Sequence, residues 1–192
     1  MTKILKENLC PKTDNNNSQI LEGKANIIDK VIQKYIPESN DSKVKNIQTD
    51  MTVLTLKIDK GFNMLNDIGY RLPNLVELNL SGSSLESISD IGISFEKVEI
   101  LNVSSCGLLE LSGIICLKNL KKLYAANNQI KDLIDLEMCD SVIFIDLSNN
   151  LIEEEENLFF LSSCSSLEKV ILSGNPIKIK DKGVLGSVNL VV

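Results

Sequence analysis

Apolar and polar positions follow one pattern in five separate segments of the chain. In residues 120–130 the first, fourth, sixth and eleventh positions are Leu120, Leu123, Ala125 and Ile130, and the ninth is Asn128. The pattern begins again at residues 75, 98, 142 and 167, so successive segments start 22 to 25 residues apart. The fourth and sixth positions predict a short strand, because alternate side chains of a strand point to the same face. The ninth position then predicts a turn.

A strand and a turn repeated at this interval are typical of a leucine-rich repeat, whose period is about 20–29 residues. We therefore predict an α/β fold, a right-handed leucine-rich-repeat solenoid with a short curved parallel sheet on its concave face. Apolar residues between the strands recur about every third position, which predicts short helical or 3₁₀ turns on the convex face.

The ninth position of each repeat is predicted to be structural. Its side chain turns inward, where it hydrogen-bonds backbone groups of neighbouring turns that no strand partner reaches. Asparagine is best suited because its amide both donates and accepts, and serine and cysteine are weaker substitutes. The residues of this structural ladder are Ser83, Cys106, Asn128, Asn150 and Asn175.

Four regions follow from the pattern. Residues 1–18 contain the polar tract TDNNNS and are expected to form a disordered N-terminal arm. Residues 19–50 are expected to form a helical N-terminal cap and a loop, because a solenoid needs its first repeat covered. The solenoid then occupies residues 51–177 and begins with a degenerate repeat, MTVLTLKID. Residues 178–192 are a C-terminal tail or incomplete cap: either 184–192 add a final strand, or the chain is a fragment or truncated.

Charge and composition bear on the partner. A net charge of −6 and a pI of about 4.8 argue against nucleic acid, because phosphate binding needs clustered Lys and Arg. No apolar run reaches the roughly 18 residues of a membrane span, so we expect no membrane insertion. Five cysteines without a CxxC pair, in a chain that does not open on an apolar signal segment, favour reduced thiols and a cytoplasmic location.

Candidate chemistry is sparse. The chain has no histidine, which removes the commonest general base and the commonest zinc ligand, and it has neither a P-loop nor a GxGxxG motif. Four consecutive glutamates, residues 153–156, are interpreted as the solvated first turn of a convex helix, because consecutive helical side chains diverge too much to bind a metal. We predict no enzymatic activity, no catalytic residue, no metal site and no cofactor.

The remaining functional surface is the concave side of the predicted sheet, where solenoids of this kind bind proteins. Its candidate partner-binding residues are the strand positions that point away from the core: Glu77, Asn79, Ile100, Asn102, Lys122, Tyr124, Phe144, Asp146, Lys169 and Ile171. Ile100, Tyr124, Phe144 and Ile171 are expected to form one apolar patch with a charged rim, as in an interaction hot spot. The alternative is that they are single exposed apolar residues of the ordinary kind.

Several motifs point beyond a generic repeat. They cover residues 50–177 and are VLTLKID at 53–59, LPNL at 72–75, the stretch containing DIG at 87–94, CGL at 106–108 followed by LSGI at 111–114, and LKKLYAANNQIKDL at 120–133. The 22-residue units resemble those of type-one protein phosphatase regulatory subunits and axonemal dynein light chains. Within that class, the chain is similar to the leucine-rich-repeat proteins of cilia and flagella that act in assembly or transport of outer dynein arms.

This resemblance implies a non-catalytic adaptor, monomeric on its own, for preassembled dynein arms or intraflagellar transport components, located in the cytoplasm and the cilium or flagellum. One alternative is a phosphatase-regulatory or other signalling scaffold, whose concave face is normally richer in acidic and tryptophan contacts; this chain has no tryptophan. Another is a permanent axonemal subunit. The ciliary group usually carries a long C-terminal extension and a cap after its last repeat, which are not seen in residues 178–192.

Overall fold

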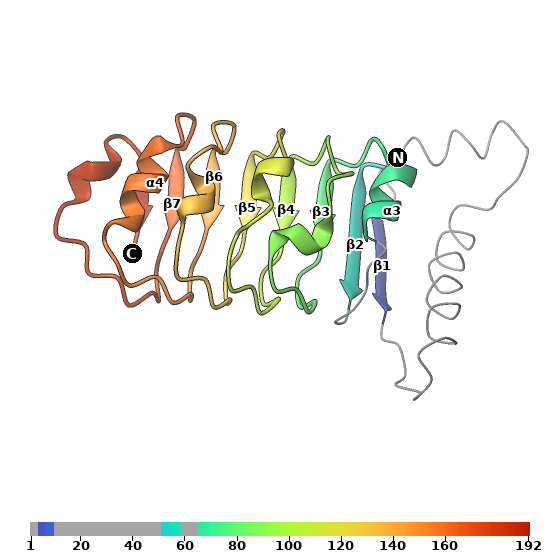
Figure 1. The fold of residues 1–192 in the computed structure, drawn as a ribbon, viewed down its shortest axis with the longest axis horizontal. Helices are drawn as coiled ribbons and strands as arrows, with labels where there is room; N and C mark the ends of the chain where they lie inside the picture. The colour runs from blue at the N-terminus through green and yellow to red at the C-terminus, as the bar shows by residue number, and fades with distance from the viewer. Residues whose placement is uncertain (1–3, 10–50, 59–64) are drawn as a thin grey trace, which may run out of the picture.

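The computed structural model describes residues 4–9, 51–58 and 65–192. The expected helical cap and loop at residues 19–50 lie outside the described residues. Eight strands form one parallel sheet and lie side by side in chain order (Figure 1). They are β1 (Ile4–Leu9), β2 (Val53–Ile58), β3 (Glu77–Asn79), β4 (Ile100–Asn102), β5 (Lys122–Tyr124), β6 (Phe144–Asp146), β7 (Lys169–Ile171) and β8 (Asn189–Val191).

The register of the sheet places equivalent repeat positions directly beside one another. Leu78 pairs with Leu101, Leu101 with Leu123, Leu123 with Ile145, and Ile145 with Val170. All five side chains are fully buried. Each parallel strand pairs with the next at the same repeat position. The leucine pattern of the sequence therefore becomes one continuous apolar row along the solenoid.

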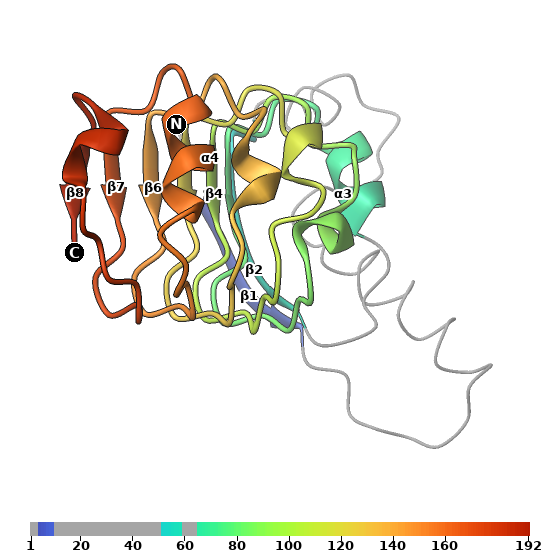
Figure 2. The same ribbon diagram turned by 60° about the vertical axis from the view of Figure 1, so that its left-hand side comes forward.

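Short helical segments cover one side of the sheet (Figures 1 and 2). Successive segments pack on one another, and their apolar residues complete a single core with the strands. No helix in the described part of the chain is long and apolar enough to cross a membrane. The segments are α3 (Leu65–Arg71), η1 (Ile88–Ile91), η2 (Ile114–Cys116), η3 (Ile134–Leu136), α4 (Asn157–Ser163) and η4 (Lys182–Leu185), where η denotes a 3₁₀ helix.

The turn after each strand has a left-handed backbone at the eighth position of the repeat. The φ angles there are +72°, +58°, +56°, +54° and +77° at Gly82, Ser105, Asn127, Asn149 and Gly174. Glycine and asparagine adopt this conformation at the least cost, which explains their recurrence immediately before the ladder position.

The strands at the two ends of the sheet bear on what we expected for the ends of the chain. Residues Ile4–Leu9 form β1, which pairs with β2, where we expected a disordered arm. A local pattern does not show this pairing, because the two strands are more than forty residues apart. At the other end β8 pairs with β7, so residues 189–191 do add a strand to the sheet.

The glutamates of residues 153–156 do not form the first turn of a helix. Helix α4 begins at Asn157 and Glu156 is its N-cap residue, so most of the run precedes the helix. Instead, Oε1 of Glu155 accepts hydrogen bonds from the backbone N–H groups of Lys180 and Asp181 at 2.6 and 3.0 Å. These bonds hold the pKa of Glu155 below its usual value and tie the repeat that begins at residue 142 to the segment before η4 in the last repeat.

Candidate protein-interaction surface

The concave strip is the row of strand side chains that face away from the core. Each of the strands β3 to β7 has three residues, of which the middle one is buried and the two outer ones are half-buried. The ten residues proposed from the sequence as partner-binding occupy these outer positions: Glu77, Asn79, Ile100, Asn102, Lys122, Tyr124, Phe144, Asp146, Lys169 and Ile171. The strand periodicity therefore places them on one face of the sheet.

The register divides the concave strip into two lines. One line consists of the first residues of successive strands, in which Phe144 lies between Lys122 and Lys169. The other consists of the third residues, in which Tyr124 lies between Asn102 and Asp146. The aromatic side chains are thus flanked by charged or polar groups on neighbouring strands.

Tyr124 and Phe144 are in direct contact across β5 and β6. Their ring centroids are 5.2 Å apart and their planes are tilted by 44°. The pair is diagonal in the register, a relationship in which aromatic side chains on neighbouring strands still reach each other. Ile100 and Ile171 are the next diagonal neighbours on β4 and β7. The register therefore places the four apolar residues of the expected patch on successive strands.

Three of the ten strip residues have a structural role that we did not predict. Oδ1 of Asn79, Asn102 and Asp146 accepts a hydrogen bond of 3.0 Å from the backbone N–H two residues later, at Ser81, Ser104 and Ser148 respectively. These are Asx turns, which fix the exit of each strand. The signal in the sequence is an Asn or Asp followed two residues later by serine, in NLS, NVS and DLS.

The ladder residues lie on the inner side of the turns and hydrogen-bond neighbouring backbone. Oδ1 of Asn128 accepts from the N–H groups of Cys106, Gly107 and Leu108 at 2.9 to 3.1 Å. Its Nδ2 donates to the carbonyl oxygens of Val103 and Ala125 at 3.0 and 2.9 Å. Asparagine therefore connects two successive repeats, as the pattern predicts.

The other ladder positions make related contacts. Asn150 and Asn175 each accept from one N–H of the preceding repeat, at Ile130 and Ile152, and donate to two or more carbonyl oxygens. Ser83 accepts from the N–H of Ile58 at 3.0 Å, and the Cys106 thiol donates to Leu80 O at 3.1 Å. Within residues 4–9, 51–58 and 65–192, each of these two side chains has fewer such bonds than Asn128.

Known proteins are similar to this chain in sequence or in fold. The human protein named leucine-rich repeat-containing protein 56 is 31% identical over 170 residues, which are 88% of this chain and 31% of the relative. The rat protein of the same name is 35% identical over 128 residues, 67% of this chain and 23% of the relative. The solved structure of internalin C2 from Listeria monocytogenes has the same fold, with a TM-score of 0.58 over 78% of this chain and 73% of that chain at 18% identity.

This chain is a leucine-rich-repeat protein. No protein-family model matches it. It spans less than a third of the length of the human and rat relatives. The repeat fold, together with relatives named for the same repeat, indicates a scaffold for interactions with other proteins.

Three of the four cysteines that the structure describes in the leucine-rich-repeat protein are core residues. Cys106, Cys139 and Cys164 are buried, and Cys116 is partly exposed on η2. Burial raises the pKa of Cys139 to about 12 and that of Cys164 to about 11, and it also raises the pKa of Cys106. A thiol with a raised pKa is a poor nucleophile at neutral pH. Among residues 4–9, 51–58 and 65–192, no group of three or more His, Cys, Asp and Glu side chains is arranged to hold a metal ion.

Proposed function

We propose that this leucine-rich-repeat chain is a non-catalytic adaptor that binds a protein partner through the concave strip. The contact between Tyr124 and Phe144 carries the proposal, because it places two half-buried aromatic side chains on the face opposite the core. Aromatic side chains dominate the binding energy of many protein interfaces, especially where polar groups surround them. Lys122 and Lys169 supply such groups on either side of Phe144.

The experiment is affinity capture with quantitative mass spectrometry, comparing the native chain with a Tyr124→Ala/Phe144→Ala variant. We expect the variant to lose its specific partner while its melting temperature stays nearly unchanged, because neither side chain belongs to the buried core. The matched control is Leu109→Ala/Leu151→Ala, which removes two exposed leucines elsewhere. Retention of the partner by the aromatic variant, or equal loss from both variants, would contradict binding at the concave strip.

For the biological setting, we propose assembly or transport of outer dynein arms, with the protein in the cytoplasm and the cilium or flagellum. The motifs of residues 53–133 support this proposal by their resemblance to ciliary leucine-rich-repeat proteins. A phosphatase-regulatory scaffold and a permanent axonemal subunit are the competing roles.

The DIG stretch of that resemblance also has a structural role in this chain. Oδ2 of Asp90 accepts hydrogen bonds from the N–H groups of Glu86 and Ser87 at 2.8 and 3.2 Å. Gly92 has a φ of +85°, and a side chain there would meet Asn66, whose Oδ1 accepts from the N–H of Ile93. The residues of the motif therefore stabilise the backbone of this chain, and a cellular experiment tests the ciliary role.

A tagged copy, expressed in ciliated cells lacking the natural protein, separates these roles. The adaptor role predicts cytoplasmic and ciliary signal and loss of outer arms on deletion. Co-purification of a phosphatase with nuclear signal would favour the signalling scaffold. Signal confined to stable axonemes, with no cytoplasmic pool, would favour the structural subunit.

A further inference from the structure

The convex side carries an exposed apolar row that the proposed function does not use. The row consists of Ile93, Ile115 and Met138, whose side chains are 63%, 53% and 71% exposed. They occupy the nineteenth, eighteenth and nineteenth positions of three successive repeats. Phe95, Leu117 and Cys139, which follow the three row residues by one or two positions, are buried, whereas Ile134 on the same side as Met138 is also 54% exposed.

Two grooves between successive repeats lie beside the row. The first groove has a volume of about 410 Å³ and is lined by Ile93 and Glu96 on one repeat and by Cys116, Lys118 and Asn119 on the next. The second has a volume of about 280 Å³ and lies between Ile115 on one repeat and Met138 and Asp140 on the next. Exposed apolar side chains that flank repeated grooves are typical of a surface where another protein inserts side chains.

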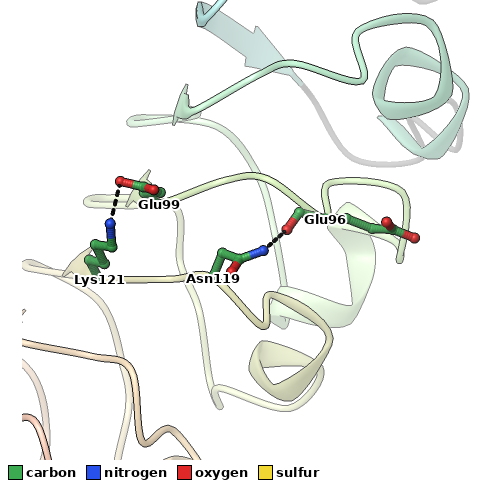
Figure 3. Close-up of polar contacts among 4 residues, drawn as sticks. All are labelled: Glu96, Glu99, Asn119 and Lys121. Atoms are coloured by element: carbon green, nitrogen blue, oxygen red, sulfur yellow. Dashed lines mark hydrogen bonds and ion pairs between the residues drawn. The ribbon is translucent and has the colours of Figure 1, made fainter.

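Two polar contacts join successive repeats at and near the first groove. Asn119 Nδ2 donates a hydrogen bond of 2.7 Å to the carbonyl oxygen of Glu96, and the Lys121 ammonium lies 2.9 Å from a carboxylate oxygen of Glu99 (Figure 3). The first contact joins the repeats that begin at residues 75 and 98, and the second joins the repeats that begin at residues 98 and 120. The hydrogen bond occupies the backbone of Glu96 and leaves its exposed carboxylate at the groove.

The charge around the row is strongly negative. The four convex segments, residues 86–97, 109–119, 131–141 and 153–165, contain twelve carboxylates and three lysines, whereas the net charge of the whole chain is −6. Burial, followed by the nearby Glu110 and Asp132 carboxylates, raises the pKa of Asp135. The carboxylates therefore repel one another in the free chain, and a positively charged partner would relieve that repulsion.

The distance between members of the row can be compared with the spacing of side chains on an α-helix. Neighbouring strands are about 4.8 Å apart, so three successive repeats span roughly 10 Å at the sheet and at least that distance on the convex side of the curve. An α-helix rises about 1.5 Å per residue, so its residues i, i+3 or i+4, and i+7 span about 10.5 Å on one face. A helix lying along the solenoid axis would thus present one apolar side chain to each repeat.

We propose that Ile93, Ile115 and Met138 form a second docking site, on the convex side, for a basic amphipathic helix of a partner protein. The helix places its apolar stripe in the two grooves and its lysines or arginines against the acidic convex segments. An anionic membrane surface or a nucleic acid would be repelled by the same carboxylates. The site is separate from the concave strip, so the two surfaces allow one chain to hold two partners at once.

The test measures binding of a fluorescent 18-residue peptide of leucine and lysine, with leucines at i, i+3, i+4 and i+7, by anisotropy. A scrambled peptide of identical composition has the same charge without the stripe. We expect the patterned peptide to bind at least tenfold more tightly than the scrambled one. Ile115→Ser/Met138→Ser should abolish that difference, and thermal unfolding should show that the variant remains folded.

Two control variants locate the site. Leu151→Ser removes an exposed leucine outside the row, and Tyr124→Ala/Phe144→Ala removes the concave aromatic pair; both should bind the patterned peptide like the native chain. Equal binding of the two peptides, no binding of either, or unchanged binding by the row variant would overturn the proposal. Binding of the native chain to phosphatidylserine vesicles through the same row would also overturn it. Since the concave variant has its own assay, failure of one site is distinguishable from failure of the other.

Discussion

Asn128 lies one repeat after Cys106, and its Oδ1 accepts the backbone N–H of Cys106 at 2.9 Å. The two residues occupy the same repeat position, so the contact is between one ladder residue and the next. The bond reaches a backbone group that no strand hydrogen bond serves, because the strands of this sheet are only three residues long here. Stability of the solenoid therefore depends on side chains in its turns as well as on its apolar rows.

Asn128→Ala should lower the free energy of unfolding by at least about 2 kcal/mol, because each buried polar group left without a partner costs about 1–3 kcal/mol. The N–H groups of Cys106, Gly107 and Leu108 all lose their acceptor. Urea denaturation measures the effect. Asn119→Ala, which removes one hydrogen bond at an exposed position, is the matched control and should cost clearly less. Equal losses for the two variants would contradict a special role for the ladder.

Leu123→Ala should cost about 2–5 kcal/mol, the range found when a buried leucine is truncated to leave a cavity. Leu123 is fully buried between Leu101 and Ile145 in the central row. Because each repeat contacts only its neighbours, amide hydrogen exchange should rise most in β4, β5 and β6. The control is Leu109→Ala, at a side chain 54% exposed, which should stay within about 0.5 kcal/mol of the native chain. Uniformly increased exchange along the solenoid would refute local fraying.

Alkaline conditions should destabilise the fold partly through Cys139. Burial, with smaller contributions from Cys164 and nearby carboxylates, raises the pKa of Cys139 from 9.0 to about 12. Between these values the unfolded chain loses the thiol proton and the folded chain keeps it, so the unfolded state is favoured as pH rises. Stability from the neutral thiol is therefore fully present below pH 9.0 and declines above it.

The measurement is urea unfolding of the native chain and Cys139→Ala at pH 7.5 and pH 10. The native chain should lose more stability between these pH values than the variant does, since the two proteins differ only at residue 139. Cys116→Ala, at a partly exposed thiol, controls for removal of a cysteine. Identical pH dependence for the native chain and Cys139→Ala would show that the buried thiol does not contribute.

The sequence predicts those parts of the fold that depend on the spacing of residues within one repeat. Leu123 and Asn128 lie at fixed positions of every repeat, and their burial and hydrogen bonds follow from strand alternation and turn chemistry. The short 3₁₀ segments follow from apolar spacing in the same way. Pairing of β1 with β2 does not follow, because it depends on residues separated by a long intervening segment.

The sequence predicts which residues form the concave strip, but only some of the contacts that these residues make. Alternation identifies Tyr124 and Phe144 as outward residues, and the register then determines that they meet diagonally. Strand periodicity alone does not predict that Asp146 accepts a hydrogen bond in a turn, because that bond depends on Ser148, two residues later. The convex row was missed because Ile93, Ile115 and Met138 look like core residues in a sequence, and only packing shows which apolar residues of a short turn remain outside.

The parallel register has a consequence for how this chain is recognised. Lys122, Phe144 and Lys169 are neighbours in space, yet they are more than twenty residues apart along the chain. A binding surface assembled in this way is a discontinuous epitope, and no short peptide cut from the chain reproduces it. Local melting of a single turn would therefore break up the proposed binding surface without changing any residue in it.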